Sequence, residues 1–253
     1  MSKTRVLTQS RPGLALIATA FVLTAAVCTA ARGDGPVSAA AENTQVTFDA
    51  AFAPRHLPAD GLARAVFLFS MRTISSYGTP PPAARRLLIE ADEHLAFRLT
   101  DIPVCRHPSL DLLLRHDPCA SAAVGYTLNE GNLYATRAAP TPGNRPQPIY
   151  NGGLVGNKRR LWIRYVVGPP AMGVMLVAAD LVPVRKGRFR TAIRLSLPGA
   201  DSGGESLSTF SMTLNKGVFG TCPGSPARIR ATVGLTAGVN LTRTLIRLCA
   251  RRT

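Results

Sequence analysis

The sequence predicts an all-β protein, mainly an antiparallel β-sandwich with one short helix, placed after an N-terminal signal peptide. Short apolar or alternating runs recur along the chain, and glycine and proline bound most of them. The 253 residues include 20 prolines and 22 glycines, which suits many short elements joined by turns. An even number of cysteines after the signal segment adds a disulfide framework.

Residues 1–31 have the three-part pattern of a secretory signal peptide. The start is basic, an apolar run covers residues 14–27, and the small residues 29–31 follow. The positive end stays in the cytoplasm while the apolar run enters the translocon, so this order predicts export. An uncleaved membrane anchor is the alternative, because residues 14–31 carry no charge and a spanning helix needs about 17 to 25 residues.

Residues 32–43 are small and polar, which predicts a flexible leader without packed structure. A single β-rich domain is expected over residues 44–253. Twelve runs in it carry the apolar or alternating pattern of strands: 44–50, 62–71, 86–91, 95–99, 122–128, 132–137, 160–167, 173–181, 188–197, 207–214, 228–234 and 241–248. Their regular spacing favours a sandwich or barrel over βαβ units.

One short helix is expected at residues 109–116. Pro108 precedes it, and proline is tolerated in a first helical turn, while Asp117 and Pro118 end the run.

Four cysteines remain once Cys28 leaves with the signal peptide, and an even count in an oxidising compartment predicts two disulfides. Three pairings are possible. We favour Cys105 with Cys119 and Cys222 with Cys249, because each pair closes a modest loop, worth about 3 kcal/mol for a loop near 15 residues.

A metal site is the alternative around the first pair. Cys105, His107, His116 and Cys119 place four soft or borderline ligands within 15 residues, a donor set that suits zinc or copper. Exported thiols are oxidised before they meet metal, so the disulfide is favoured and no metal or cofactor is predicted.

The spacing of several short motifs resembles a group of exported actinobacterial proteins of uncharacterised activity. The motifs are Gly78-Thr-Pro-Pro-Pro82, Cys105, Cys119, Val124-Gly125, Tyr150-Asn151-Gly152, Cys222-Pro223 and Cys249. The chain departs from that group's usual pattern at Ala120, which follows the second cysteine in place of proline. The resemblance implies a bacterial envelope setting and no catalytic residue.

The formal net charge is +16, and the signal segment accounts for only three of these charges. Such an excess favours polyanionic partners through salt-sensitive attraction. Because 26 of the 30 basic residues are arginine, a GC-rich coding sequence is an alternative explanation of the charge.

Basic residues cluster around two neighbouring predicted strands, which gives a candidate binding face for acidic polymer. Its members are Lys158, Arg159, Arg160, Trp162, Arg164, Arg188, Arg190 and Arg194. Guanidinium groups bind oxyanions through paired hydrogen bonds, and the indole adds a platform. The alternative is a solvated sheet face with Trp162 half-buried at its edge.

Sequence motifs of the common hydrolases, nucleotide-binding proteins and zinc proteases are absent. We therefore expect a non-enzymatic exported binding or structural domain whose partner is an anionic envelope polymer or a protein. Export disfavours nucleic acid, and membrane contact is expected only through an uncleaved signal segment. The alternative is a secreted glycan hydrolase with a β-sandwich fold, which needs two carboxylates facing one cleft, drawn for example from Glu90, Asp92 and Glu93. His56, His94, His107 and His116 are the available imidazoles, and each is expected to be exposed.

Overall fold

The computed structural model describes residues 35–41, 43–75, 82, 84–109, 117–128, 146–167, 173–197, 209–236 and 238–251. The chain divides into two compact units, residues 1–32 and 33–253, and all described residues belong to the second. The predicted signal segment therefore lies outside the described residues. No helix in the described part is long and apolar enough to cross a membrane.

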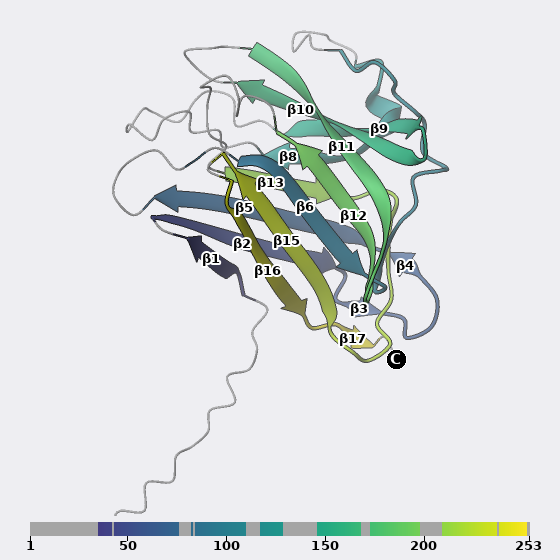
Figure 1. The fold of residues 1–253 in the computed structure, drawn as a ribbon. Helices are drawn as coiled ribbons and strands as arrows, with labels where there is room; N and C mark the ends of the chain where they lie inside the picture. The colour runs from purple at the N-terminus through teal and green to yellow at the C-terminus, as the bar shows by residue number, and fades with distance from the viewer. Residues whose placement is uncertain are drawn as a thin grey trace, which may run out of the picture. The chain divides into compact units, whose positions relative to one another are not determined.

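The second unit is built almost entirely from antiparallel strands (Figure 1). In chain order the strands are β1 (Val37–Ala41), β2 (Thr44–Ala53), β3 (His56–Leu57), β4 (Ala63–Arg64), β5 (Val66–Ser75), β6 (Ala84–Asp92), β7 (Leu95–Phe97), β8 (Ala123–Leu128), β9 (Gln147–Val155), β10 (Lys158–Val167), β11 (Gly173–Lys186), β12 (Phe189–Ser196), β13 (Thr209–Leu214), β14 (Val218–Gly220), β15 (Ala227–Leu235), β16 (Asn240–Arg247) and β17 (Ala250–Arg251). A single 3-10 turn, Ala120–Ala122, precedes β8.

Twelve of these strands form one continuous sheet in the order β1-β2-β5-β13-β8-β9-β10-β11-β12-β6-β15-β16. Its end strands β1 and β16 lie against each other, so the sheet is nearly closed and barrel-like. A separate two-sheet sandwich is not confirmed. The alternation of apolar and polar residues predicts an inner and an outer face for each strand. It does not predict whether the strands form two sheets or one sheet that continues through β9 and β6.

The inside of the sheet is a single large apolar cluster. In β2 every second residue is buried, among them Val46, Phe48 and Phe52. The rings of Phe48 and Phe69 lie 6.4 Å apart, centroid to centroid. Burial along β2 thus alternates with period 2, as the sequence pattern predicts.

Glycine is required where β8 approaches β13. A Cβ at Gly125 would lie 1.9 Å from the carbonyl oxygen of Thr213, so a side chain there would force the two strands apart. The glycine therefore keeps the ladder intact at this point of the sheet.

Both predicted disulfides are confirmed, Cys105 with Cys119 and Cys222 with Cys249. The first pairing removes the two thiolates that the alternative metal site needs. Disulfides of this kind suit an oxidising, extracytoplasmic compartment.

The predicted leader is wrong in part, because Val37–Ala41 forms the edge strand β1 and pairs with β2. The small residues of β1 show little apolar alternation, so their strand conformation depends on the hydrogen bonds with β2. Four further strands lacked a prediction: the nine-residue β9, the three-residue β14 and the two-residue β3 and β17. Residues 110–116 of the predicted helix and the candidate strand 132–137 lie outside the described residues.

Two arginines of β16 bridge the seam between the sheet ends. Arg243 donates from Nε to the carbonyl oxygen of Ser38 in β1, at 2.8 Å. Arg247, which is 4 % exposed, donates to the carbonyl oxygens of Ala50 and Gly35 and pairs with Asp49. Side-chain donors thus replace the strand-to-strand ladder where the barrel fails to close.

We expect Arg247→Met to lower the free energy of unfolding by about 2 kcal/mol, because it leaves buried carbonyl groups without a donor. The matched variant Arg243→Met, at an exposed side chain, is expected to cost less than about 1 kcal/mol. Urea unfolding followed by circular dichroism measures both. Equal losses for the two variants would contradict a role of Arg247 in closing the seam.

Candidate binding surface

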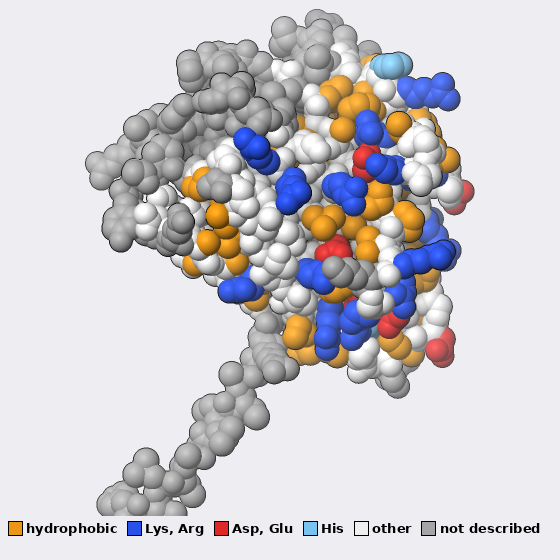
Figure 2. Space-filling model, in the orientation of Figure 1, with side chains coloured by type: hydrophobic (Ala, Val, Ile, Leu, Met, Phe, Trp, Pro, Cys, Tyr) orange, Lys and Arg blue, Asp and Glu red, His pale blue; other side chains and the backbone are white. Residues whose placement is uncertain are grey.

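The outward side of β10, β11, β12, β6 and β15 forms one surface, which we call the basic face. It is outward because the alternate residues, such as Leu161, Ala179 and Leu195, lie in the core. Its members are Lys158, Arg160, Trp162, Asp180, Arg188, Arg190, Arg194, Arg86, Glu90, Asp92, Arg228 and Arg230 (Figure 2). The figure shows Lys and Arg side chains spread over these strands with acidic side chains among them.

Arg160 is held at the centre of a small stack. Its Nε lies 2.6 Å from Asp180 Oδ1, and its guanidinium carbon lies 5.3 Å from the ring centroid of Trp162. The indole covers Gly152, where a Cβ would approach the ring to 2.8 Å. A bulge between β9 and β10 places this glycine beneath the ring. Arg160 and Trp162 therefore share one face, as predicted.

Two predicted members lie away from this exposed surface. Arg164 is 7 % exposed and donates from Nη2 to the carbonyl oxygen of Ser109, so it supports the chain near the first disulfide. Arg159 points to the other side of β10, where Nη1 lies 3.5 Å from the carbonyl oxygen of Leu99. The predicted set also included Arg159, which strand alternation places on the opposite side of β10 from Arg160.

Tyr150 forms a satellite cluster with the Cys105–Cys119 disulfide and Ala122, and Trp162 packs at its edge. The phenol donates to Asp117, and Arg164 lies over the ring with its guanidinium carbon 5.7 Å from the centroid. Burial, with the hydrogen bond to Asp117, raises the pKa of Tyr150 well above its ordinary value. The cluster is therefore a rigid edge of the basic face.

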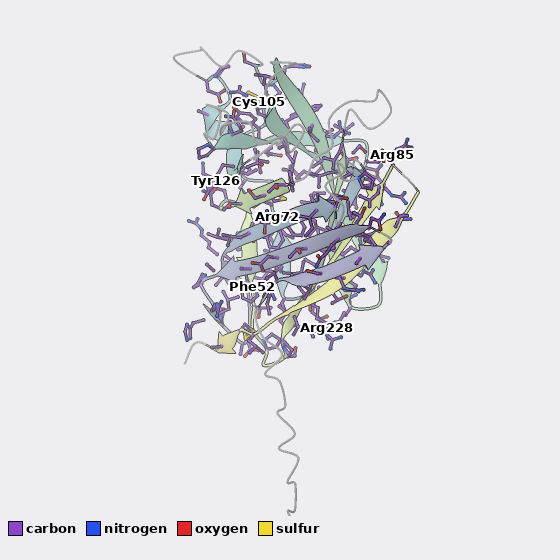
Figure 3. The ribbon with its side chains drawn as sticks, turned by 90° about the vertical axis from the view of Figure 1, so that its left-hand side faces the viewer. Phe52, Arg72, Arg85, Cys105, Tyr126 and Arg228 are labelled. Atoms are coloured by element: carbon purple, nitrogen blue, oxygen red, sulfur yellow. A yellow bond between two sulfur atoms is a disulfide. The ribbon has the colours of Figure 1, made fainter. Side chains whose placement is uncertain are left out.

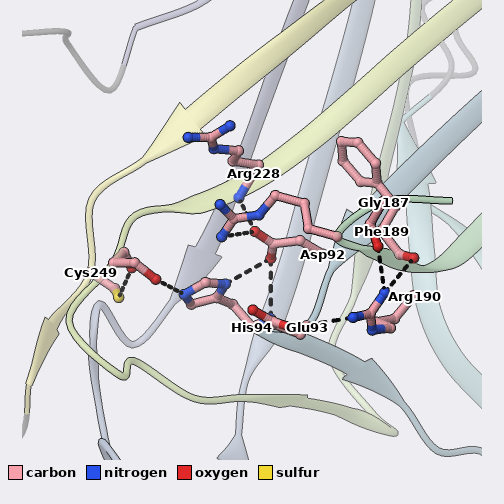
Figure 4. Close-up of polar contacts among 10 residues, drawn as sticks. Asp92, Glu93, His94, Gly187, Phe189, Arg190, Arg228 and Cys249 are labelled. Atoms are coloured by element: carbon pink, nitrogen blue, oxygen red, sulfur yellow. Dashed lines mark hydrogen bonds and ion pairs between the residues drawn. The ribbon is translucent and has the colours of Figure 1, made fainter. Parts of the chain in front are cut away.

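Arg188 and Arg190 are placed at the far end of the face by two acids at the end of β6 (Figure 4). Arg188 Nη2 lies 3.3 Å from Asp92 Oδ2, and Arg190 Nη2 lies 3.6 Å from Glu93 Oε2. Arg190 also donates to the carbonyl oxygen of Gly187, at 2.7 Å. Both cations are thus partly neutralised.

Arg230 belongs to the same face but escaped the sequence-based prediction. Its Nε and Nη2 donate to the two carboxylate oxygens of Glu90, at 2.5 and 2.6 Å, and this raises its pKa. The guanidinium also lies 4.2 Å from the centroid of the Phe189 ring. Glu90 in β6 and Arg230 in β15 are 140 residues apart in the sequence, so local sequence spacing does not predict their contact.

Three arginines on the face keep no acidic partner in the described part of the chain: Arg86, Arg194 and Arg228. All three are exposed. Arg86 extends across Gly234, where a Cβ would lie 2.7 Å from its Cγ, and donates to Asn240 Oδ1 at 2.9 Å. Arg194 in β12 lies opposite Leu88 in β6, and Arg86 is two residues from Leu88 on the same side of β6. The two arginines are therefore diagonal neighbours.

None of the carboxylates proposed for a hydrolase lines the hollow found among the described residues. Glu90 is 5 % and Asp92 is 0 % exposed, and each is engaged by arginine, whereas Glu93 is exposed and lies 3.6 Å from Arg190. This shallow hollow of about 340 Å³ lies elsewhere, on the β2, β5, β13 and β8 side that Figure 3 turns to the viewer. Among its lining residues Asp49 is the one carboxylate, and it is paired with Arg247.

The histidines differ from the prediction at one position. His56 and His107 are exposed, as expected, whereas His116 lies outside the described residues. His94 is 1 % exposed, so its predicted exposure is wrong. The turn after β6 tucks the ring under the loop that carries Cys222, a contact that the sequence around His94 does not show.

No protein-family model matches the chain, and neither a curated protein nor a solved structure does. Function is therefore argued from the geometry of the surface alone. The resemblance to exported actinobacterial proteins stays a prediction.

The raised pKa of Tyr150 predicts a pH dependence of stability. Above about pH 10 the unfolded chain releases a phenol proton that the folded chain keeps, so stability falls as pH rises, by up to about 1.4 kcal/mol per pH unit. Urea unfolding between about pH 9 and 11 is the measurement. Tyr150→Phe is expected to make the decline shallower, and an unchanged slope would contradict the assignment.

Proposed function

We propose that the protein is an exported binding domain whose basic face holds an anionic polymer, an acidic polysaccharide or a phosphate-bearing chain. The observation that carries the proposal is the diagonal pair Arg86 and Arg194, both exposed and neither in an ion pair among the described residues. Asp180, which lies opposite Arg194 across β11 and β12, pairs with Arg160 instead. Guanidinium groups donate in pairs to carboxylate, sulfate and phosphate oxygens, so two such groups on adjacent strands suit consecutive charges of a polymer.

The paired arginines support this function by giving the face its shape. Arg160 and Arg230 are fixed by Asp180 and Glu90, which removes much of their conformational freedom. Their pairing lowers the net charge of the face but leaves its surplus on Arg86, Arg194 and Arg228. A polymer bound there therefore meets ordered side chains and loses less rotamer entropy on association.

The stack of Arg160 and Trp162 supplies a second kind of contact. The indole is only part-buried, and it lies two residues along β10 from Arg160. An exposed aromatic surface next to guanidinium groups suits the apolar faces of sugar rings as well as their charged substituents. This favours an acidic polysaccharide within the proposed class.

A retention experiment tests the proposal. The protein is passed over purified anionic cell-wall polymer and over dextran sulfate, and bound protein is eluted with rising salt. Retention is expected at low salt and lost as salt rises. Arg86→Gln with Arg194→Gln is expected to lower the slope of log affinity against log salt by about one to two, since two contacts are removed.

The matched control is Arg64→Gln with Arg72→Gln, which removes the same charge at two exposed arginines outside the basic face. This control is expected to bind nearly as the unchanged protein does. Absence of retention at low salt would remove the proposal, and equal weakening by both double variants would reduce it to general attraction by net charge.

A further inference from the structure

A serine, a histidine and an aspartate form one hydrogen-bonded row where β6 meets the loop before β15 (Figure 4 labels the last two). His94 Nδ1 lies 2.9 Å from Asp92 Oδ1, and His94 Nε2 lies 3.0 Å from Ser225 Oγ. The serine comes from a segment 131 residues away from the histidine. The row has the connectivity of an acid, a base and a nucleophile in acyl transfer.

The hydrogen bonds around Asp92 fix the direction of the row. Its carboxylate accepts from the backbone N–H groups of His94 and Arg228, at 3.1 and 2.8 Å, and pairs with Arg188. A carboxylate oxygen is an acceptor, so the proton of His94 sits on Nδ1 and Nε2 is left as an acceptor. The Ser225 hydroxyl therefore donates to Nε2, which is the direction needed for proton removal from the serine.

Burial is graded along the row. Asp92 is 0 % and His94 is 1 % exposed, whereas Ser225 is exposed. Water is thus kept from the acid–base pair, where the low dielectric strengthens the interaction, while Ser225 lies at the surface.

The loop that carries Ser225 is held in place from both sides. Cys222 is bonded to Cys249, whose sulfur lies 3.7 Å from the carbonyl oxygen of Ser225. Gly224 has φ +102°, a conformation open to glycine, and Pro226 restricts the backbone of the residue before it, Ser225. The backbone N–H groups of Gly224 and Ser225 form no hydrogen bond within the described part of the chain, and N–H donors beside the nucleophile are what an oxyanion needs.

We infer that Ser225 is the nucleophile and His94 the general base of an esterase site, with Asp92 as the residue that positions His94. The Ser225 oxygen bonds to the ester carbonyl carbon as its proton passes to His94 Nε2. The carbon–oxygen bond to the alcohol then breaks, and the alcohol leaves with that proton. Water then attacks the acyl carbon while His94 takes its proton. The bond from that carbon to the Ser225 oxygen breaks, the serine regains the proton, and the carboxylic acid leaves.

The substrate class is a carboxylic ester presented at a surface, because Ser225 is exposed. This activity does not depend on the polymer-binding proposal, because none of Arg86, Arg194 and Arg160 belongs to the row.

Labelling of the folded protein with an alkyl fluorophosphonate tests the inference. The Ser225 oxygen–phosphorus bond forms, fluoride leaves, and the proton passes to His94. Mass spectrometry is expected to find the label on Ser225 in the folded chain and not in the urea-denatured chain. The unchanged protein is also expected to hydrolyse 4-nitrophenyl acetate with a burst of one nitrophenolate per chain.

Ser225→Ala is expected to abolish label and burst, and Ser38→Ala, at an exposed serine of β1, to keep both. His94→Gln is expected to slow labelling about 100-fold or more, with its fold checked by circular dichroism. For Asp92→Asn the readout is the pH profile, because loss of the acceptor for Nδ1–H removes fast labelling at neutral pH.

Equal labelling of Ser225 in the folded and denatured chains would overturn the inference and leave the row as a structural link between two loops. The Arg86→Gln, Arg194→Gln double variant is expected to label normally. Loss of polymer retention with normal labelling, or the reverse, separates the failure of one proposal from that of the other.

Discussion

The closure of one long sheet on itself is the constraint on which the rest of the structure depends. Twelve antiparallel strands twist until β1 and β16 meet, but the ladder does not continue across this seam. Arg247 fills the gap with guanidinium donors to main-chain carbonyls, and Arg243 adds a further donor near the surface. The inner cluster of aromatic and aliphatic side chains remains enclosed because these edges are satisfied rather than open.

Arginine recurs as the partner of every acid that the sheet fixes on its basic face. Asp180, Glu90 and Asp92 each lie on a strand opposite or beside an arginine, so their carboxylates can be partly or fully buried without a missing partner. The chain has 30 basic and 14 acidic residues, so arginines are left over once the acids are paired. The exposed arginines Arg86, Arg194 and Arg228 are part of this remainder; Arg194 lies opposite Asp180, but that carboxylate pairs with Arg160.

The row from Asp92 through His94 to Ser225 lies where the end of β6 meets the loop that carries the second disulfide. The turn after β6 and the loop after β14 are brought together by the small β4-β14-β7 sheet and by the second disulfide. Asp92 therefore serves two surfaces, since one side of its carboxylate meets Arg188 of the basic face and the other meets His94. A binding surface and a candidate nucleophile thus share one buried carboxylate.

Period-2 alternation, glycine and proline punctuation and the cysteine count determined most of the longer strands, their inner and outer faces and the two disulfides, because these features act over a few residues or through one covalent bond. The joining of all twelve strands into one sheet, the strand at 37–41, and the pairing of Arg230 with Glu90 were decided by tertiary structure. So were the burial of His94 and its contact with Ser225, since each joins segments separated by tens to hundreds of residues. Local pattern shows which face a side chain occupies, but only the strand order shows which neighbour it meets there.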